Sequence, residues 1–459
     1  MSAPAAPPPL RIGNASGFYG DRFGALREML TGGPLDVLTG DYLAELTMLI
    51  LARDRAKDPS RGYARTFLKQ LEEALGLAVE RGVSIVVNAG GLNPAGLAQA
   101  VRDLAGKLGV PATVAHVEGD DLLPRAAELG LPEGLLAANA YLGARGIAAC
   151  LEAGADVVVT GRVTDASLVV GPAAAHFGWR WDDFDALAGA TAAGHVLECG
   201  AQATGGNYAF FTEHDMRRPG FPLAEIHPDG SSVITKHPGT GGAVTVETVT
   251  AQLLYETGPA RYAGPDVTTR LDTVRLHQDG PDRVAVTGVR GEAPPPTLKA
   301  GLNRLGGWQN EVVFVLTGLD VDAKAALARD QLETALGRRR PAEVRWTLAR
   351  TDRPDADVQE EASALLHLSV KDPDATAVGR AVSAAAVELA LASYPGFHVT
   401  APPSDGSPYG VFDSAHLDAA AVPHTAVLPD GRRVDIPPAP LTRPLDDLPE
   451  APLPEPPPP

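Results

Sequence analysis

The sequence predicts an α/β protein: a mostly parallel doubly wound sheet with an α+β extension and a small C-terminal ferredoxin-like α+β domain. Short apolar stretches alternate with amphipathic helical stretches over residues 10–221. Five of the apolar stretches run into loops rich in Gly, Asn, Asp, Ser or Thr. Because the carboxyl ends of parallel strands gather at one edge of a sheet, these loops should meet where such folds bind ligands. A barrel is the alternative, since only five strands are well marked.

The first domain, residues 10–221, takes its strands from the apolar stretches and its helices from the segments between them. We expect strands at Leu10–Gly13, Leu35–Leu38, Ser84–Val87, Ala112–Ala115 and Asp156–Thr160. Asp41 can cap a helix over Tyr42–Arg53. Apolar spacing and terminal glycines predict further helices at Ala64–Arg81, from Asn93-Pro94 to Leu108, and at Leu135–Ala153.

The remainder of the chain has a different pattern. Residues 222–350 predict an α+β segment that completes the large domain, with hairpin turns at residues 228–231 and 278–281 and a helix at Val244–Tyr255. A β-α-β unit is expected from Glu311–Leu316, Asp322–Leu336 and Glu343–Leu348. Residues 351–360 should form a linker and residues 361–437 the ferredoxin-like domain. Its elements are expected at Leu365–Val370, Thr376–Ala392, Gly396–Thr400 and a hairpin across residues 428–431. Residues 1–9 and 438–459 should be disordered or extended tails.

Composition narrows the function classes. A hydrophobic content of 44% and a charged content of 21% are ordinary for a soluble globular protein of 459 residues. The net charge of −18 argues against nucleic acid as a partner. No apolar run is long enough to cross a membrane. The first nine residues lack the pattern of a signal peptide, and two cysteines fit a reducing compartment, so we expect a cytoplasmic protein. A homo-oligomer is left open.

The loop after the fifth strand, residues 160–167, holds the densest group of chemical side chains. Arg162 offers a planar fork for a carboxylate or phosphate. Asp165 can orient that arginine, act as a base, or cap the following helix. We take Arg162 and Asp165 as catalytic candidates, together with Asp41.

His195 is the fourth catalytic candidate, because it joins Glu198 and Cys199 to a glycine-rich polar loop. Cys199 can be a nucleophile with His195 as its base, but a small buried cysteine is the more frequent outcome. We therefore give His195 an acid–base role.

Glycine-rich and amide-bearing loops are the candidate ligand-binding elements, because closely spaced glycines let backbone N–H groups approach an anion. Tight structural turns explain the same patterns, and none matches a dinucleotide fingerprint or a P-loop. The loop before the helix at residue 244 adds Gly241 to the set. The ligand-binding candidates are Gly13, Asn14, Ser16, Gly17, Asn88, Gly90, Gly91, Thr164, Gln202, Gly205, Gly206, Asn207 and Gly241.

No metal and no cofactor is predicted. The sequence contains neither His-Glu-x-x-His nor Cys-x-x-Cys, and His116 followed by Asp120-Asp121 is only a weak metal alternative. The absence of a Gly-x-Ser-x-Gly elbow disfavours an ordinary serine hydrolase.

Five segments together resemble the acyclic terpene utilisation family, AtuA. They are Arg11–Asp21, Thr39–Glu45, Asn88–Pro94, Gly161–Ser167 and Gly239–Val246. The resemblance covers nearly the whole chain between the tails. It implies a large N-terminal domain to about residue 350, a smaller ferredoxin-like C-terminal domain, and a setting in catabolism of acyclic terpenes and related branched acids as acyl-CoA esters. It supplies neither a reaction nor catalytic residues.

Two functional hypotheses follow. The first is an enzyme acting on a carboxylate or acyl-CoA thioester, by hydrolysis or carbon–carbon cleavage rather than redox chemistry, with Arg162 binding an anion. The second is a non-catalytic acyl-CoA-binding or scaffold subunit. An enzyme should bring Asp41, Asn88, Arg162 and Asp165 around one concave pocket.

Overall fold

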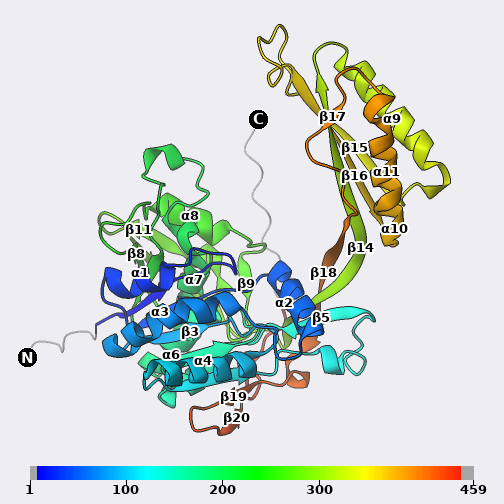
Figure 1. Ribbon diagram of the computed structural model, residues 1–459. Helices are drawn as coiled ribbons and strands as arrows, with labels where there is room; N and C mark the ends of the chain where they lie inside the picture. The colour runs from blue at the N-terminus through cyan, green and yellow to red at the C-terminus, as the bar shows by residue number, and fades with distance from the viewer. Residues whose placement is uncertain (1–7, 446–459) are drawn as a thin grey trace, which may run out of the picture. The chain divides into compact units, whose positions relative to one another are not determined.

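The computed structural model describes residues 8–445, which divide into two compact units (Figure 1). Unit 1 comprises residues up to 303 and from 412 onward, and unit 2 comprises residues 304–411. These limits differ from the predicted boundaries at 350 and 361. The segment predicted to be a linker, residues 351–360, instead connects two neighbouring antiparallel strands within unit 2. Most of each predicted tail, residues 1–7 and 446–459, lies outside the described residues.

Five parallel strands form the centre of the main sheet of unit 1. In spatial order they are β1 (Leu10–Asn14), β2 (Val37–Gly40), β3 (Ser84–Val87), β6 (Val157–Thr160) and β4 (Val114–Glu118). They correspond to the five predicted strands, with ends displaced by up to three residues. The observed order is an open path rather than a barrel.

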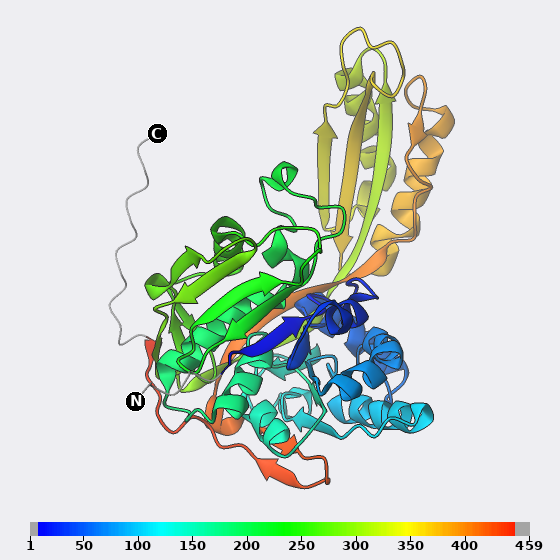
Figure 2. The ribbon, with the colours of Figure 1, turned by 90° about the vertical axis from the view of Figure 1, so that its left-hand side faces the viewer.

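Antiparallel strands extend this sheet at both edges, so that its described part has eleven strands and is mixed. Figure 2 shows β1 beside β7, although the two are far apart in sequence. The hairpins predicted at residues 228–231, 278–281 and 428–431 are present. The last of these pairs with β4 in unit 1 rather than belonging to a C-terminal domain. The added strands are β7 (Pro222–Ile226), β8 (Ser232–Lys236), β11 (Arg275–Gln278), β12 (Arg283–Thr287), β19 (Thr425–Val427) and β20 (Arg433–Asp435).

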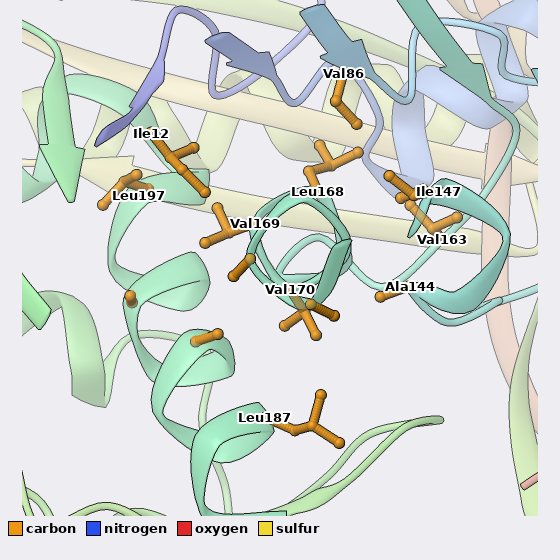
Figure 3. Close-up of a cluster of buried hydrophobic side chains, with 14 of the residues drawn as sticks. Ile12, Val86, Ala144, Ile147, Val163, Leu168, Val169, Val170, Leu187 and Leu197 are labelled. Carbon is orange, nitrogen blue, oxygen red and sulfur yellow. The ribbon is translucent and has the colours of Figure 1, made fainter. Parts of the chain in front are cut away.

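The two faces of the parallel strands belong to separate cores, as the two-residue period of a strand requires. On β3, Val86 packs in one cluster, whereas Ile85 and Val87 pack in the other. Figure 3 shows Val86 and Ile12 above the helices that cover the first face. That face is covered by α5 (Arg145–Glu152), α6 (Ser167–Phe177), α7 (Phe184–Glu198) and α8 (Val246–Leu254). The other is covered by α1 (Ala25–Gly32), α3 (Arg65–Arg81) and α4 (Pro94–Leu108).

The first half of the predicted helix Leu135–Ala153 is wrong, and only its second half is helical. The segment forms strand β5 (Leu135–Ala140), a short connection, and then α5. The backbone N–H of Ala140 donates to the Asp120 carbonyl, and that of Tyr141 donates to the Lys299 carbonyl. These tertiary hydrogen bonds outweigh the helix propensity of an alanine-rich stretch.

The helices predicted over Tyr42–Arg53 and Thr376–Ala392 also differ from prediction. Helix α2 (Glu45–Lys57) begins three residues after the predicted start, and its N-cap is Ala44 rather than Asp41. The helix predicted over Thr376–Ala392 is interrupted at Gly379, giving α10 (Ala375–Val378) and α11 (Arg380–Glu388). Because Ala44 rather than Asp41 is the N-cap of α2, the carboxylate of Asp41 has no capping role.

Unit 2 has the element order β-α-β-β-α-β. Its elements are β14 (Thr297–Thr317, entering from unit 1), α9 (Val321–Leu336), β15 (Glu343–Ala349), β16 (Ser363–Asp372), α10–α11 and β17 (His398–Val399), with strand order β15-β16-β14-β17. Strand β18 (Ser407–Asp418) leads back to unit 1. On β14, Val312 and Phe314 pack with the helices. The predicted β-α-β unit exists in chain order, but β16 lies between β14 and β15.

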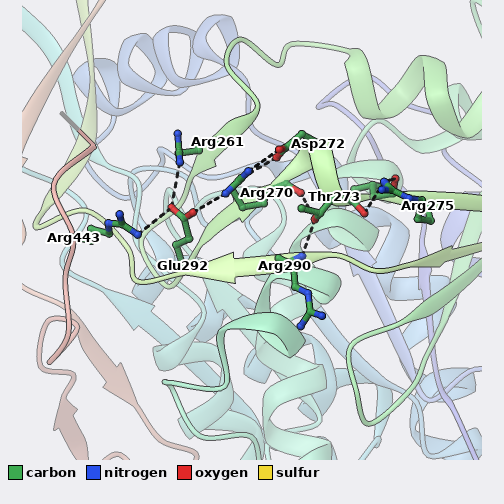
Figure 4. Close-up of polar contacts among 9 residues, drawn as sticks. Arg261, Arg270, Asp272, Thr273, Arg275, Arg290, Glu292 and Arg443 are labelled. Carbon is green, nitrogen blue, oxygen red and sulfur yellow. Dashed lines mark hydrogen bonds and ion pairs between the residues drawn. The ribbon is translucent and has the colours of Figure 1, made fainter. Parts of the chain in front are cut away.

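Ion pairs hold together a small second sheet of unit 1. It consists of β9 (Arg261–Ala263), β10 (Thr268–Arg270) and β13 (Arg290–Glu292). Figure 4 shows the carboxylate of Glu292 between Arg261, Arg270 and Arg443, with its oxygens 3.3, 3.0 and 3.9 Å from their nitrogens. This network fixes β9, which contributes to the cavity described below.

None of the helices within residues 8–445 is long and apolar enough to span a bilayer.

Candidate functional site

A cavity of about 640 Å³ lies in unit 1, where the loops after β2 and β6 meet the end of α7. Small-molecule sites commonly enclose about 300–1,000 Å³. All four catalytic candidates, Asp41, Arg162, Asp165 and His195, line this cavity. Other lining residues include Asp21, Glu45, Tyr141, Glu198, Cys199, Tyr255, Glu256, Tyr262, Lys299 and His416.

The loop after β2 presents Asp41 to the cavity. Asn88, at the end of β3, donates from Nδ2 to Asp41 Oδ1 at 2.6 Å and accepts from the Tyr42 backbone N–H at 2.7 Å. Burial raises the pKa of Asp41 well above its usual range, and the nearby charge of Asp165 raises it further, while Arg162 opposes both. Asn88 does not line the cavity, so its role is to hold Asp41 in place.

The loop after β6 presents Arg162 and Asp165. Arg162 Nη1 donates at 3.0 Å to both the Leu43 carbonyl and Asp165 Oδ1. The guanidinium also lies over the Tyr141 ring, 4.3 Å from its centroid. Burial raises the pKa of Asp165, whereas Arg162 lowers it. One nitrogen of Arg162 thus ties the two loops together and is already occupied by an acceptor on each.

Asp120 holds the loop after β6 through the backbone of Arg162. Its Oδ2 accepts from the Arg162 backbone N–H and from Asn139 Nδ2, each at 2.8 Å. Burial raises the pKa of Asp120 to about 7. His116 instead lies 2.8 Å from Glu118 Oε1. Within residues 8–445, no group of three or more His, Cys, Asp or Glu side chains is placed to hold a metal ion.

The last turn of α7 carries a buried histidine–carboxylate pair. His195 Nδ1 lies 2.9 Å from Glu198 Oε1, and the two side chains are 3% and 7% exposed. Burial lowers the pKa of His195, but Glu198, Asp165 and the Tyr255 backbone together outweigh burial, so the pKa of His195 is raised overall. Burial raises the pKa of Glu198 to about 7, against the opposing effect of His195.

This pair is incompletely hydrogen-bonded. Glu198 Oε2 has no hydrogen-bond partner among the described residues, and neither ring nitrogen of His195 completes a hydrogen bond of good geometry there. The Tyr255 backbone nevertheless favours the protonated ring. Buried polar groups in native proteins nearly always have partners. An incomplete pair on a cavity wall is therefore a place for a ligand group.

Other parts of the wall come from residues that the sequence did not single out as candidates. Tyr141 Oη lies 3.2 Å from Glu45 Oε1, and Lys299 Nζ lies 4.7 Å from the centroid of the Tyr141 ring. The Tyr262 ring centroid is 5.4 Å from that of His195. Tyr141 was missed because its segment was predicted to be helical, and Lys299 because the start of β14 was not predicted.

Of the candidate ligand-binding residues, five line the cavity: Gly17, Thr164, Gln202, Gly206 and Asn207. The other eight are not on its wall: Gly13, Asn14, Ser16, Asn88, Gly90, Gly91, Gly205 and Gly241.

Several of those eight have structural roles instead. Asn14 Nδ2 donates to the carbonyls of Leu197 and Glu198 at 2.6 and 3.2 Å, which joins β1 to the end of α7. A Cβ at Gly90 would lie 2.4 Å from the Thr160 carbonyl oxygen, and one at Gly241 would lie 2.7 Å from that of Arg218. These glycines are required by close backbone packing.

Cys199 lines the cavity, but its thiol is held in the protonated form. Burial raises the pKa of Cys199, and the carboxylate of Glu198 raises it further. Because the thiolate is the nucleophile, this environment disfavours nucleophilic catalysis by Cys199.

Comparison with known proteins gives one match. The model of the family described as "Acyclic terpene utilisation family protein AtuA" matches residues 10–428. No curated protein and no solved structure matches the chain.

Proposed function

The chain belongs to the acyclic terpene utilisation family AtuA, and from this premise we propose that it is an enzyme of acyclic terpene or branched-acid catabolism. Its substrate in this proposal is a carboxylate or an acyl-CoA thioester. The family name supports the connection with acyclic terpene utilisation. The remainder of the proposal depends on the cavity.

The supporting observation is a group of buried carboxyl groups with raised pKa values, next to a histidine, around one cavity. The pKa values of Asp41, Asp165 and Glu198 are all raised, chiefly by burial, and His195 pairs with Glu198. Carboxyl groups with raised pKa values in a cavity are typical of general acids and bases, because they can hold and release a proton near neutral pH. A scaffold protein has no need for such an arrangement.

The proposed roles follow from the contacts. The His195–Glu198 pair takes a proton from the reacting group or returns it, and Asp41 and Asp165 are the other acid–base candidates. Arg162 contacts Asp165 and the Leu43 carbonyl, so we now give it the role of positioning Asp165 rather than binding a substrate anion. Hydrolysis and carbon–carbon cleavage both need a proton removed from one oxygen and a proton delivered to the leaving group.

The test is turnover of a panel of straight and branched acyl-CoA thioesters by the purified protein. Release of free thiol reports hydrolysis, and mass spectrometry of the acyl products reports carbon–carbon cleavage. We expect turnover by wild type, a roughly 100-fold or greater loss in Glu198→Gln, and no loss in the matched control Glu80→Gln on the surface of α3. Binding without any product would instead support the non-catalytic acyl-CoA-binding or scaffold subunit.

Three finer expectations belong to the same proposal. Helices on both faces of the parallel strands support a doubly wound arrangement in unit 1. The β-α-β-β-α-β order and the strand order support a ferredoxin-like unit 2, at residues 304–411 rather than 361–437. A cytoplasmic location is retained as an expectation.

A further inference from the structure

The buried end of the cavity is rich in carboxyl groups. Asp165 and Glu198 both raise the pKa of Asp41, and Asp165 and Glu256 both raise that of Glu198. The positive groups beside these carboxyl groups are already engaged: Arg162 donates to Asp165, and His195, whose pKa is raised, pairs with Glu198. A ligand carboxylate placed here would add a further negative charge in a poorly solvated space, which is strongly unfavourable. The ligand group that reaches this end should therefore be uncharged.

The buried atoms without hydrogen-bond partners limit which chemical group can bind at this end. Glu198 Oε2 is buried and needs a donor, while the adjacent His195 ring can donate or accept. A carbonyl oxygen can only accept, so it would leave Glu198 Oε2 without a partner whenever this carboxyl group is ionised. A hydroxyl group both donates and accepts. One hydroxyl can thus complete the hydrogen bonding of both side chains.

The exposed part of the wall also carries a cation, Lys299, close enough to the Glu45 carboxylate to lower its pKa. Lys299 is exposed, and its Nζ lies over the rings of Tyr141 and Phe412, 4.7 and 5.8 Å from their centroids. An ammonium group in this position favours an anionic or strongly polar ligand end. Leu43 and Leu298 add apolar surface to the cavity.

We propose that the cavity takes a hydroxylated acyl compound, with the hydroxyl group against Glu198 and His195 and the carboxylate or thioester toward Lys299. This inference rests on the proposed function for the acyl nature of the ligand. It adds the hydroxyl group and the direction in which the ligand lies.

The experiment is isothermal titration calorimetry of the full chain with matched thioesters. The probes are butanoyl-CoA, 3-hydroxybutanoyl-CoA and glutaryl-CoA, with decanoyl-CoA and 3-hydroxydecanoyl-CoA as a longer pair. We expect the hydroxylated member of at least one pair to bind about tenfold or more tightly, since a hydrogen bond to a charged group is worth about 1.5–3 kcal/mol. Glutaryl-CoA, which would place a carboxylate at the buried end, should bind more weakly than 3-hydroxybutanoyl-CoA.

A variant assigns the preference to Glu198. Glu198→Ala should reduce it to less than about threefold, and the surface control Glu80→Ala should keep it. The wild-type comparison stands without any variant, so it decides the hydroxyl inference even where Glu198→Ala does not fold. A preference that persists in folded Glu198→Ala would overturn the assignment to this residue.

The outcomes separate the two proposals. Equal affinities within both pairs, or tighter binding of glutaryl-CoA, would overturn the hydroxyl inference, while the turnover assay would still decide the proposed function. A hydroxyl preference without turnover would remove the enzyme proposal and support the inference. Failure of all five thioesters to bind would overturn the hydroxyl inference, while the turnover assay on straight and branched thioesters would still decide the proposed function.

Discussion

Two of the histidine–glutamate pairs in the described structure have nearly equal nitrogen–oxygen distances, but the pKa values of their glutamates are shifted in opposite directions. In His116–Glu118 the closest nitrogen–oxygen distance is 2.8 Å, and in His195–Glu198 it is 2.9 Å. The hydrogen bond from His116 and the contact with Arg433 lower the pKa of Glu118 to about 2, although partial burial opposes them. Burial raises the pKa of Glu198 to about 7.

The difference lies in the surroundings of the carboxylate. The Glu118 side chain is 27% exposed, and its second oxygen accepts from Arg433 Nη2 at 2.8 Å. The Glu198 side chain is 7% exposed, and its second oxygen has no partner among the described residues. A histidine–carboxylate contact is therefore not evidence of a functional pair by itself. The second partner and access to water distinguish an ion pair that stabilises the fold from a pair that can exchange a proton.

The largest expected difference between the pairs is in turnover. His195→Gln should lower kcat/KM by roughly 100-fold or more, because general acid–base groups typically contribute 10²- to 10⁴-fold. His116→Gln should change it by less than about twofold, as expected for a residue outside the cavity. Steady-state kinetics on any thioester turned over by wild type measures both. Similar losses in the two variants would remove the distinction between the pairs.

The second difference is in the pH dependence of stability at Glu198. Its folded-state pKa of about 7 exceeds the ordinary 4.5, so the folded protein binds the Glu198 proton more tightly than the unfolded chain does. The resulting contribution to stability is present below pH 4.5 and is lost as pH rises through 7. The raised pKa of His195 acts in the same direction, and its contribution to stability begins to be lost above about pH 6.5.

Glu198→Gln removes the carboxyl part of this loss. The variant should match wild type near pH 4.5 and should be more stable by on the order of 2 kcal/mol at pH 8. Chemical denaturation at the two pH values measures the difference. A Glu198→Gln variant that is less stable than wild type at pH 8 would show that Glu198 is ionised and well stabilised in the folded protein.

Glu118→Gln should give the opposite sign. Its lowered pKa contributes stability that is present above the unfolded pKa of about 4.5 and is lost as pH falls toward 2. Removing the charge should cost about 1 kcal/mol at pH 7, as for a partly exposed ion pair. The same denaturation experiment detects this loss, which should shrink as the pH is lowered below 4. A stabilising effect at pH 7 would contradict the comparison.

The smallest effect tests the role of Arg433. Arg433→Met should move the pKa of Glu118 upward from about 2, because a positive charge next to the carboxylate is lost. It should not reach the value of Glu198, since His116 and partial exposure remain. NMR titration of the Glu118 carboxyl carbon measures the shift. A midpoint near 7 would mean that exposure contributes little to the difference between the pairs.

The sequence alone predicted the parallel strands and part of the cavity. Asp41 and Arg162–Asp165 were found because each follows an apolar strand in a polar loop, and parallel strands end at one edge. Glu198 was not made a candidate, although it lies three residues after His195 on one helix, a spacing that brings side chains together. That spacing was the available signal.

The rest depended on contacts between distant residues. Tyr141 was hidden in an alanine-rich segment whose helix propensity is overridden by hydrogen bonds to Lys299 and Asp120. Asn88 was expected to bind ligand, yet its amide holds Asp41. The limits of unit 2 differ from prediction because β14 and β16 pair with one another across some fifty residues of sequence. Local patterns contain none of this information.

The most direct test of the account is a ¹³C NMR titration of the Glu198 and Glu118 carboxyl carbons, with and without saturating 3-hydroxybutanoyl-CoA or 3-hydroxydecanoyl-CoA, whichever binds more tightly. We expect Glu198 to titrate near pH 7 and Glu118 near pH 2, and we expect the ligand to shift the Glu198 resonance only. Ordinary midpoints near 4.5 for both residues, or a bound ligand that leaves the Glu198 resonance unchanged, would contradict it.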